Sequence, residues 1–118
     1  MLKFVCYPHC TTCKRARDFL DRRDIAYEER DISTENPTAE ELGLWLDRSG
    51  LTPDKIFNTS GIRYRSQGLK ARIPDMSREE ALETLSSDGM LVRRPILIGE
   101  DFVLFGFKES EWNEKVGE

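Results

Sequence analysis

A short apolar segment that leads through a cluster of cysteines into an amphipathic helix constrains this chain more than any other feature. Residues 2–6 are mostly apolar and are followed by Tyr7-Pro8, which favours a buried strand that ends there. Over residues 11–23, apolar side chains recur at helical spacing between charged ones, which predicts a helix packed on a sheet. The mixed segment 25–32 predicts a second strand nearer an edge. This order favours a parallel pair of strands with a right-handed crossover.

The middle of the chain predicts helices only. Capping-box patterns begin at Thr38 and at Ser77, each ahead of an apolar run, so we expect a helix over about 38–49 and another that ends by Gly89. The sequence between them, which is punctuated by proline and glycine, predicts short helical turns.

The last third of the chain predicts the second half of the sheet. Two apolar segments, 96–98 and 102–105, flank Gly99-Glu100-Asp101, which indicates an antiparallel hairpin with a three-residue turn. A final helix around 109–115 can pack Trp112 on the sheet. The expected fold class is therefore α/β, with a βαβ unit and a ββα unit.

We expect residues 1–118 to form a single domain, with the helical insertion at about 35–91. A chain of 118 residues has the length of one domain, and 38% hydrophobic residues can fill a core. Its apolar runs fall short of the roughly 18 residues that span a bilayer, and the N-terminus lacks a signal-peptide core. These features predict a cytoplasmic protein that does not associate with a membrane.

The charge balance bears on partners. There are 18 Lys plus Arg against 22 Asp plus Glu, so the net charge is −4. Sequence-independent contact with phosphates requires a basic surface. We therefore expect no direct contact with nucleic acid, and any role on DNA would pass through a protein partner. The chain is expected to be a monomer.

Three cysteines, Cys6, Cys10 and Cys13, fall within eight residues. Cys10 stands where the strand gives way to the helix, and free N–H groups and the helix dipole favour a thiolate at a helix N-terminus. Cys13 follows one turn later on nearly the same face, so its sulfur can displace a group attached to Cys10 by forming a disulfide. Cys10 is thus the candidate nucleophile and Cys13 the candidate resolving thiol.

Other interpretations of the cluster remain open. A C-x-x-C beside a βαβ unit is typical of a thiol redox site, but buried inert thiols are an alternative. The cysteine spacing also matches a radical-type iron–sulfur pattern, although the chain is too short for the usual barrel. A zinc site formed by the thiols and His9 has no distant ligand pair to complete it. We therefore expect neither a metal nor a bound cofactor, and Cys6 is expected to be a buried residue at a strand end.

Two further features lie near this chemistry in the predicted fold. His9 directly precedes Cys10 and is either an exposed side chain or a group that lowers the thiol pKa. Arg93-Arg94-Pro95 leads into the apolar segment 96–98. If that strand lies beside the first, Arg94 can hold an oxyanion or stabilise the thiolate. The alternative is that both arginines are solvated.

Four segments together resemble the arsenate reductase (ArsC) family in its Spx/MgsR-like branch: CTTCKRAR at 10–17, FNTSG at 57–61, RRPILI at 93–98 and VLFGFK at 103–108. The resemblance extends from Phe4 to Trp112. It implies a thioredoxin-like fold interrupted by a helical subdomain, in agreement with the organisation predicted above.

The resemblance also implies an activity. In the reductases, the cysteine that Cys10 matches attacks arsenate, the arginine that Arg94 matches holds the oxyanion, and a small thiol or glutaredoxin releases arsenite. Pro95 matches a proline that such folds hold in the cis form. External reductants would be glutathione with glutaredoxin, or thioredoxin. The site residues assigned in this way are the catalytic Cys10, Cys13 and Arg94 and, around the thiolate or anion, His9, Thr11, Thr12 and Pro95.

Two departures from the reductases separate two hypotheses. Asn58 and Gly106 stand where glutathione-dependent reductases carry arginines, and each charge-assisted contact to an anion contributes about 1.5–3 kcal/mol. In Spx-like regulators the C-x-x-C is a redox switch, and the protein binds the C-terminal domain of the RNA polymerase α subunit; those regulators carry Thr-Arg-Ser where this chain has Thr59-Ser60-Gly61. The hypotheses are a thiol oxidoreductase acting on a small oxyanion or a protein thiol, and a redox-sensing transcriptional regulator.

Overall fold

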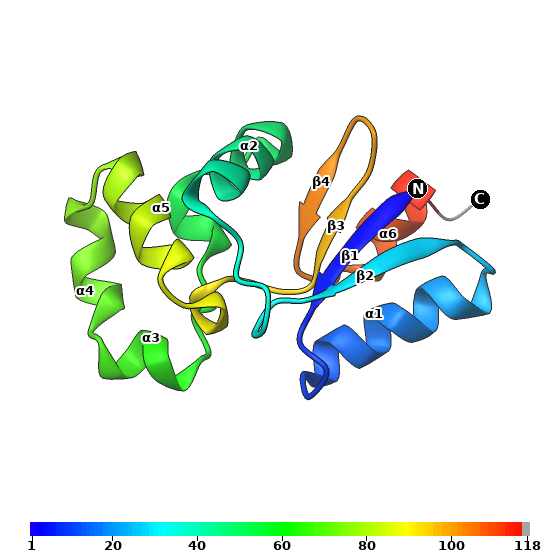
Figure 1. Ribbon diagram of the computed structural model, residues 1–118, viewed down its shortest axis with the longest axis horizontal. Coiled ribbons are helices and arrows are strands. Elements are labelled where there is room, and N and C mark those ends of the chain that lie inside the picture. Colours follow the sequence, from blue (N-terminus) through cyan, green and yellow to red (C-terminus); the bar gives the residue numbers. More distant parts are fainter. Residues whose placement is uncertain (117–118) are drawn as a thin grey trace.

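The computed structural model describes residues 1–116 as a mixed α/β fold around a four-stranded sheet of order β2-β1-β3-β4 (Figure 1). The strands are β1 (Leu2–Cys6), β2 (Tyr27–Asp31), β3 (Ile96–Ile98) and β4 (Val103–Phe105). The α-helices are α1 (Thr11–Arg22), α2 (Ala39–Ser49), α3 (Ile62–Ser66), α4 (Leu69–Arg72), α5 (Arg78–Ser86) and α6 (Glu109–Val116). Short 3-10 helices are η1 (Pro53–Ile56), η2 (Ile73–Asp75) and η3 (Gly89–Leu91).

The strand pairing confirms the sequence prediction in all but one detail. β1 pairs in parallel with the edge strand β2 and antiparallel with β3, and β3 pairs antiparallel with β4. The predicted three-residue hairpin turn is wrong by one residue. β3 ends at Ile98 and β4 begins at Val103, so the connection includes Phe102, and the Gly99 N–H donates to the Phe102 carbonyl at 2.9 Å across it.

The two faces of the sheet carry separate clusters of buried side chains. Phe4 and Cys6 of β1 face α1 and α6, where they pack with the buried residues Cys13, Ala16, Phe19, Leu20, Leu97, Leu104 and Trp112. Val5 faces the other way, toward the cluster that includes Leu42, Trp45 and Leu46 of α2. This alternation follows from the two-residue period of a strand. The predicted helix over 109–115 is confirmed, with Trp112 fully buried.

Helices α2 to α5 follow β2, and α3, α4 and α5 lie on the side of α2 away from the sheet (Figure 1). Both predicted capping boxes are present: Thr38 accepts from the Glu41 N–H, Ser77 accepts from the Glu80 N–H, and both glutamates return the bond. α2 ends at Gly50, whose φ of 75° is readily adopted by glycine. Within the described residues, no helix is both long and apolar enough to cross a membrane.

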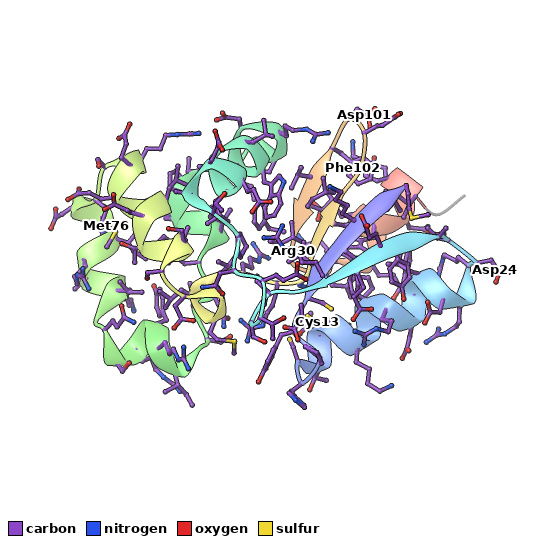
Figure 2. The ribbon with its side chains drawn as sticks, viewed as in Figure 1. Cys13, Asp24, Arg30, Met76, Asp101 and Phe102 are labelled. Atoms are coloured by element: carbon purple, nitrogen blue, oxygen red, sulfur yellow. The ribbon has the colours of Figure 1, made fainter. Side chains whose placement is uncertain are left out.

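An ion pair ties α2 to the edge of the sheet. Arg30 of β2 binds the two carboxylate oxygens of Glu41 at 2.8 and 3.0 Å, and Figure 2 shows Arg30 between the sheet and the helices. The Arg30 guanidinium also donates to the carbonyls of Glu35 and Asn36 at 3.0 and 3.2 Å. The Arg30 side chain therefore anchors the connection between β2 and α2.

We expect Glu41→Gln to lower the free energy of unfolding at pH 7 by about 1 kcal/mol, because a bidentate but partly exposed ion pair is lost. Hydrogen bonding to Arg30 lowers the pKa of Glu41 to about 2, below its value in the unfolded chain. Its contribution is therefore complete only above the unfolded value of 4.5 and is lost as the pH falls from there toward 2. Urea unfolding at several pH values should show the two proteins converging over that interval. A difference that stays constant down to pH 2 would contradict the assignment.

Candidate functional site

The junction between β1 and α1 presents Cys10 at a helix N-terminus, as predicted. Cys10 is the N-cap residue of α1 and has extended backbone angles. Its N–H donates to the Tyr7 carbonyl at 3.0 Å, and its carbonyl accepts from the Lys14 N–H at 3.0 Å. These two bonds hold the turn after β1, and they leave the Cys10 side chain half-buried at the positive end of the helix dipole.

The surroundings of Cys10 favour its thiolate. Partial burial opposes the charge, but hydrogen bonds from the N–H and thiol of Cys13, the charge of Arg94 and the Thr12 N–H together lower the pKa of Cys10. A low thiol pKa at a half-exposed position is the property of a reactive cysteine. Cys10 is therefore the candidate nucleophile whose thiolate the site favours.

Cys13 has the opposite environment. Its side chain is fully buried, and its sulfur accepts from the Tyr7 N–H at 3.4 Å. Hydrogen bonding to Cys6 and burial raise the pKa of Cys13 far above its usual range, and the nearby Cys10 charge adds to the shift. Cys13 is thus held protonated beside the Cys10 thiolate, which fits a resolving thiol in reserve. The cysteines Cys6, Cys10 and Cys13 are present as free thiols.

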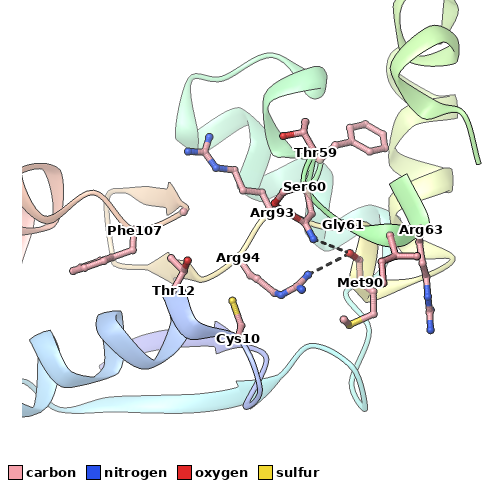
Figure 3. A pocket seen from close by; sticks show the side chains of 14 residues that line it. Cys10, Thr12, Thr59, Ser60, Gly61, Arg63, Met90, Arg93, Arg94 and Phe107 are labelled. Carbon is pink, nitrogen blue, oxygen red and sulfur yellow. Dashed lines mark hydrogen bonds between the residues drawn. The ribbon is translucent and has the colours of Figure 1, made fainter. Parts of the chain in front are cut away.

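Arg94 lines the same pocket as Cys10 and lies beside it, and its guanidinium extends toward the Met90 carbonyl (Figure 3). Its Nη1 donates to the carbonyls of Met90 and Val92 at 3.2 and 3.4 Å, and its guanidinium carbon lies 5.3 Å from the Tyr7 ring centroid. The buried Nε has no hydrogen-bond partner within residues 1–116. The peptide bond to Pro95 is cis, as the resemblance implied. Arg94 is thus the cation that the sequence expected beside the thiol.

Cys10 and Arg94 share a pocket of about 820 Å³ (Figure 3). One wall comes from the cysteine turn and the β3 and β4 ends, and the other comes from the segment between η1 and α3. Asn58 and Gly106, where the glutathione-dependent reductases carry arginines, line the same pocket. The remaining lining residues are Thr12, Phe57, Thr59, Ser60, Gly61, Ile62, Arg63, Met90, Arg93 and Phe107.

Arg93 is a pocket residue whose role the sequence did not reveal. A Cβ placed on Gly106 would lie 2.7 Å from Nε and 2.9 Å from Nη2 of Arg93. The Arg93 guanidinium therefore occupies the space beside the glycine, and its Nη1 also donates to the Lys55 carbonyl at 3.4 Å. Gly106 has a φ of 81°, which favours glycine in any case. Gly106 stands where the reductases carry an arginine, and because it has no side chain it leaves room for the Arg93 guanidinium.

The remaining predicted site residues divide into two groups. Thr12 lines the pocket, whereas Pro95 is buried outside the lining and its carbonyl accepts from the Gly106 N–H at 2.7 Å. Thr11 and His9 are exposed and lie outside the lining; the His9 ring stacks edge-on with Tyr7 at 5.3 Å. Of the two interpretations of His9, the exposed side chain describes its position.

The residues of the site do not form a metal centre. Within residues 1–116, no group of three or more His, Cys, Asp and Glu side chains is placed to hold a metal ion. The chemistry that the described residues offer is that of thiols beside guanidinium groups.

Comparison with known proteins identifies the family. The ArsC family model matches residues 6–115. The chain belongs to the ArsC family. It is 42% identical to the uncharacterized protein YusI of Bacillus subtilis (strain 168) over 96% of each chain. It is 33% identical to the regulatory protein MgsR of the same organism, over 93% of this chain and 86% of MgsR.

A solved structure confirms the predicted fold class. The crystal structure described as a possible arsenate reductase from Streptococcus mutans UA159 superposes with a TM-score of 0.87 at 40% identity, over 96% of this chain and 98% of that one. This ArsC chain is therefore an α/β protein with the thioredoxin-like arrangement of its family.

We expect Arg94→Met to raise the pKa of Cys10, because the substitution removes the cation that stabilises the thiolate. The rate of Cys10 alkylation by iodoacetamide, followed by mass spectrometry across pH, should rise with a midpoint below the ordinary value of about 8.5 in the wild type. The midpoint should move to higher pH in the variant. Lys14→Met is the matched control, since Lys14 is exposed and paired with Asp18. An unchanged midpoint in Arg94→Met would show that Arg94 does not act on Cys10.

Proposed function

We propose that this ArsC-family chain is a thiol–disulfide oxidoreductase in which Cys10 attacks and Cys13 resolves. The observation that carries the proposal is that the Cys10 thiol, with its lowered pKa, shares a pocket with the Arg94 guanidinium, while the buried Cys13, whose pKa is raised, lies behind Cys10 in the core. A nucleophile, a group that stabilises negative charge and a second thiol are the components that disulfide-forming reductions require.

With an arsenate-like oxyanion as substrate, the steps balance as follows. The Cys10 thiolate attacks the pentavalent centre, and an oxygen ligand leaves as water once protonated. Cys13 then attacks the Cys10 sulfur and gives its proton to an oxygen of the departing arsenic group; a Cys10–Cys13 disulfide forms, and the electron pair of the broken sulfur–arsenic bond reduces arsenic to the trivalent state. Glutathione with glutaredoxin, or thioredoxin, returns the disulfide to two thiols by exchange.

The arginine pattern sets the expected substrate preference. Arg93, Arg94 and Arg63 line the pocket, but Arg63 is paired with Asp88, and Asn58 and Gly106 offer no positive charge. A divalent oxyanion would therefore meet fewer charged donors than in a reductase with three arginines at these places, and each one contributes about 1.5–3 kcal/mol. The pocket accordingly favours either weak oxyanion binding or a protein thiol or disulfide as substrate.

The first test is arsenate reduction by the purified protein, with the glutathione–glutaredoxin and thioredoxin systems supplied in parallel and NADPH oxidation followed. Cys10→Ser should abolish turnover, because the hydroxyl cannot replace the thiolate. Cys13→Ser should retain the first attack and accumulate a mixed disulfide between Cys10 and the small thiol, detected by intact mass. Thr34→Ser, at an exposed position outside the pocket, is the control. Turnover that persists in Cys10→Ser would refute the assigned nucleophile.

A second candidate function is a redox-sensing regulator. Two observations favour it: the similarity to MgsR, which is named a regulatory protein, and the exposed apolar side chain of Ile62 at the rim of the Cys10 pocket. Ile62 is 76% exposed although it borders the redox-active thiol. A protein surface docked there would sense whether Cys10 is free or joined to Cys13.

The resemblance to Spx-like regulators names the partner for the test. Titration calorimetry of the reduced and oxidised protein against the C-terminal domain of the RNA polymerase α subunit should give dissociation constants that differ between the two states. Cys13→Ser should remove the difference, because the disulfide cannot form, and Ile62→Ser should weaken the binding. Absence of heat in both redox states would end this candidate.

A further inference from the structure

Cys6 is a third thiol that the proposed chemistry does not use. It is the last residue of β1, is fully buried, and faces α1. Cys6 and Cys13 belong to the same buried cluster, and Cys10 packs against it. Cys13 is therefore the common neighbour of two thiols, one at the pocket and one in the core.

The surroundings of Cys6 are unlike those of an inert core cysteine. Nη2 of Arg17 donates to the Cys6 sulfur at 3.4 Å, and the Cys6 thiol donates to Oε2 of Glu29 at 3.4 Å. Arg17 and Glu29 are themselves paired at 2.8 Å. A buried thiol thus touches a cation that can stabilise its thiolate and a carboxylate that can accept its proton.

Glu29 also connects this group with solvent. Its side chain is 39% exposed on the edge strand β2, and the hydrogen bond from Arg17 lowers the pKa of Glu29, so the carboxylate is ionised at neutral pH. A proton received from Cys6 can therefore leave the protein without crossing the core. A buried cysteine without such a contact has no route by which its proton can reach solvent.

We propose that Cys6 is a second resolving thiol, which attacks Cys13 in the Cys10–Cys13 disulfide to form a Cys6–Cys13 disulfide and release Cys10. This inference rests on the proposed function, since that function supplies the first disulfide. The exchange needs no further oxidant, because one disulfide replaces another.

The exchange is balanced in atoms and electrons. The Cys6 proton passes to the Glu29 carboxylate and from there to water, and Arg17 stabilises the thiolate that remains. The Cys6 sulfur forms a bond to the Cys13 sulfur while the Cys10–Cys13 bond breaks. Cys10 leaves with the electron pair as a thiolate, which is the form that Arg94 and the helix N-terminus stabilise. The low pKa of the leaving thiol favours this direction.

After the exchange, the oxidised protein carries a disulfide between two buried cysteines, and Cys10 is again free to act as the nucleophile. Cys6 and Cys13 are both fully buried, whereas Cys10 is open to the pocket. An external thiol can reach the Cys6–Cys13 disulfide only through Cys10, by reversal of the exchange. The oxidised protein would therefore keep a reactive Cys10, and the core disulfide would be protected from direct reduction.

The test labels the thiols in two stages. The reduced protein is oxidised with one equivalent of diamide, quenched in acid after increasing times, unfolded, and treated with N-ethylmaleimide to mark the free thiol. The disulfide is then reduced and alkylated with iodoacetamide. One tryptic peptide, residues 4–14, carries all three cysteines, so fragmentation of this single peptide shows which cysteine bears the first label.

We expect the first label to begin on Cys6 and to move to Cys10 with time. Glu29→Gln should slow that movement by about tenfold or more, since the proton acceptor is lost. Glu28→Gln, on the same strand with an exposed side chain, should leave the rate unchanged. In Cys6→Ser, which keeps the size of the side chain, Cys10 and Cys13 should remain joined and Cys10 should never carry the first label.

The outcomes separate this inference from the proposed function. A first label that stays on Cys6 at all times, with Cys10 and Cys13 joined, would overturn the exchange and leave the proposed function intact. Three first labels on one peptide would overturn both, because no disulfide would have formed. If the first label moved from Cys6 to Cys10 at the same rate in Glu29→Gln and in the wild type, Glu29 would not be the acceptor of the Cys6 proton.

Discussion

The antiparallel pairing of β1 with β3 is the constraint on which the site depends. Val5 lies opposite Ile96, so the turn that follows β1 and the residues that precede β3 meet at the same end of these two central strands. Cys10 comes from the first of these segments and Arg94 from the second. No local feature of either segment would bring them together, because 84 positions of sequence separate the thiol from the guanidinium. The pairing turns two distant motifs into one electrostatic environment.

Burial gives Cys10 and Cys13, which are close in sequence, different chemical properties. Cys10 stands before the first turn of α1 and is stabilised as a thiolate, whereas Cys13 points into the core one turn later and is held protonated. The three-residue spacing would place both side chains on one helix face in any sequence. The asymmetry comes from the sheet beneath α1, which covers Cys13 and leaves Cys10 at the pocket.

The sequence predicted those parts of the structure that local patterns encode. The capping boxes at Thr38 and Ser77, the apolar stripe of α1 and the position of Cys10 all follow from spacing within a few residues. The hairpin connection is one residue longer than predicted, and the Gly99 N–H donates to the Phe102 carbonyl across it. The two interpretations of His9 could not be separated, since adjacency in sequence does not fix the direction of a side chain.

Apart from Arg94 beside Cys10, which the sequence predicted, the contacts between elements that shape the pocket were beyond the reach of sequence reasoning. The space beside Gly106 is filled by Arg93, which only the close approach of β3 and β4 makes possible. The thiols come from the strand–helix unit at the start of the chain, while Asn58 and its neighbours come from the segment between η1 and α3. Substitutions in that wall can change what binds without altering the thiol pKa values, because the groups that set those values lie on the opposite wall or at Arg94. Arg94 belongs to both parts of the site, because it lowers the pKa of Cys10 and also lines the pocket.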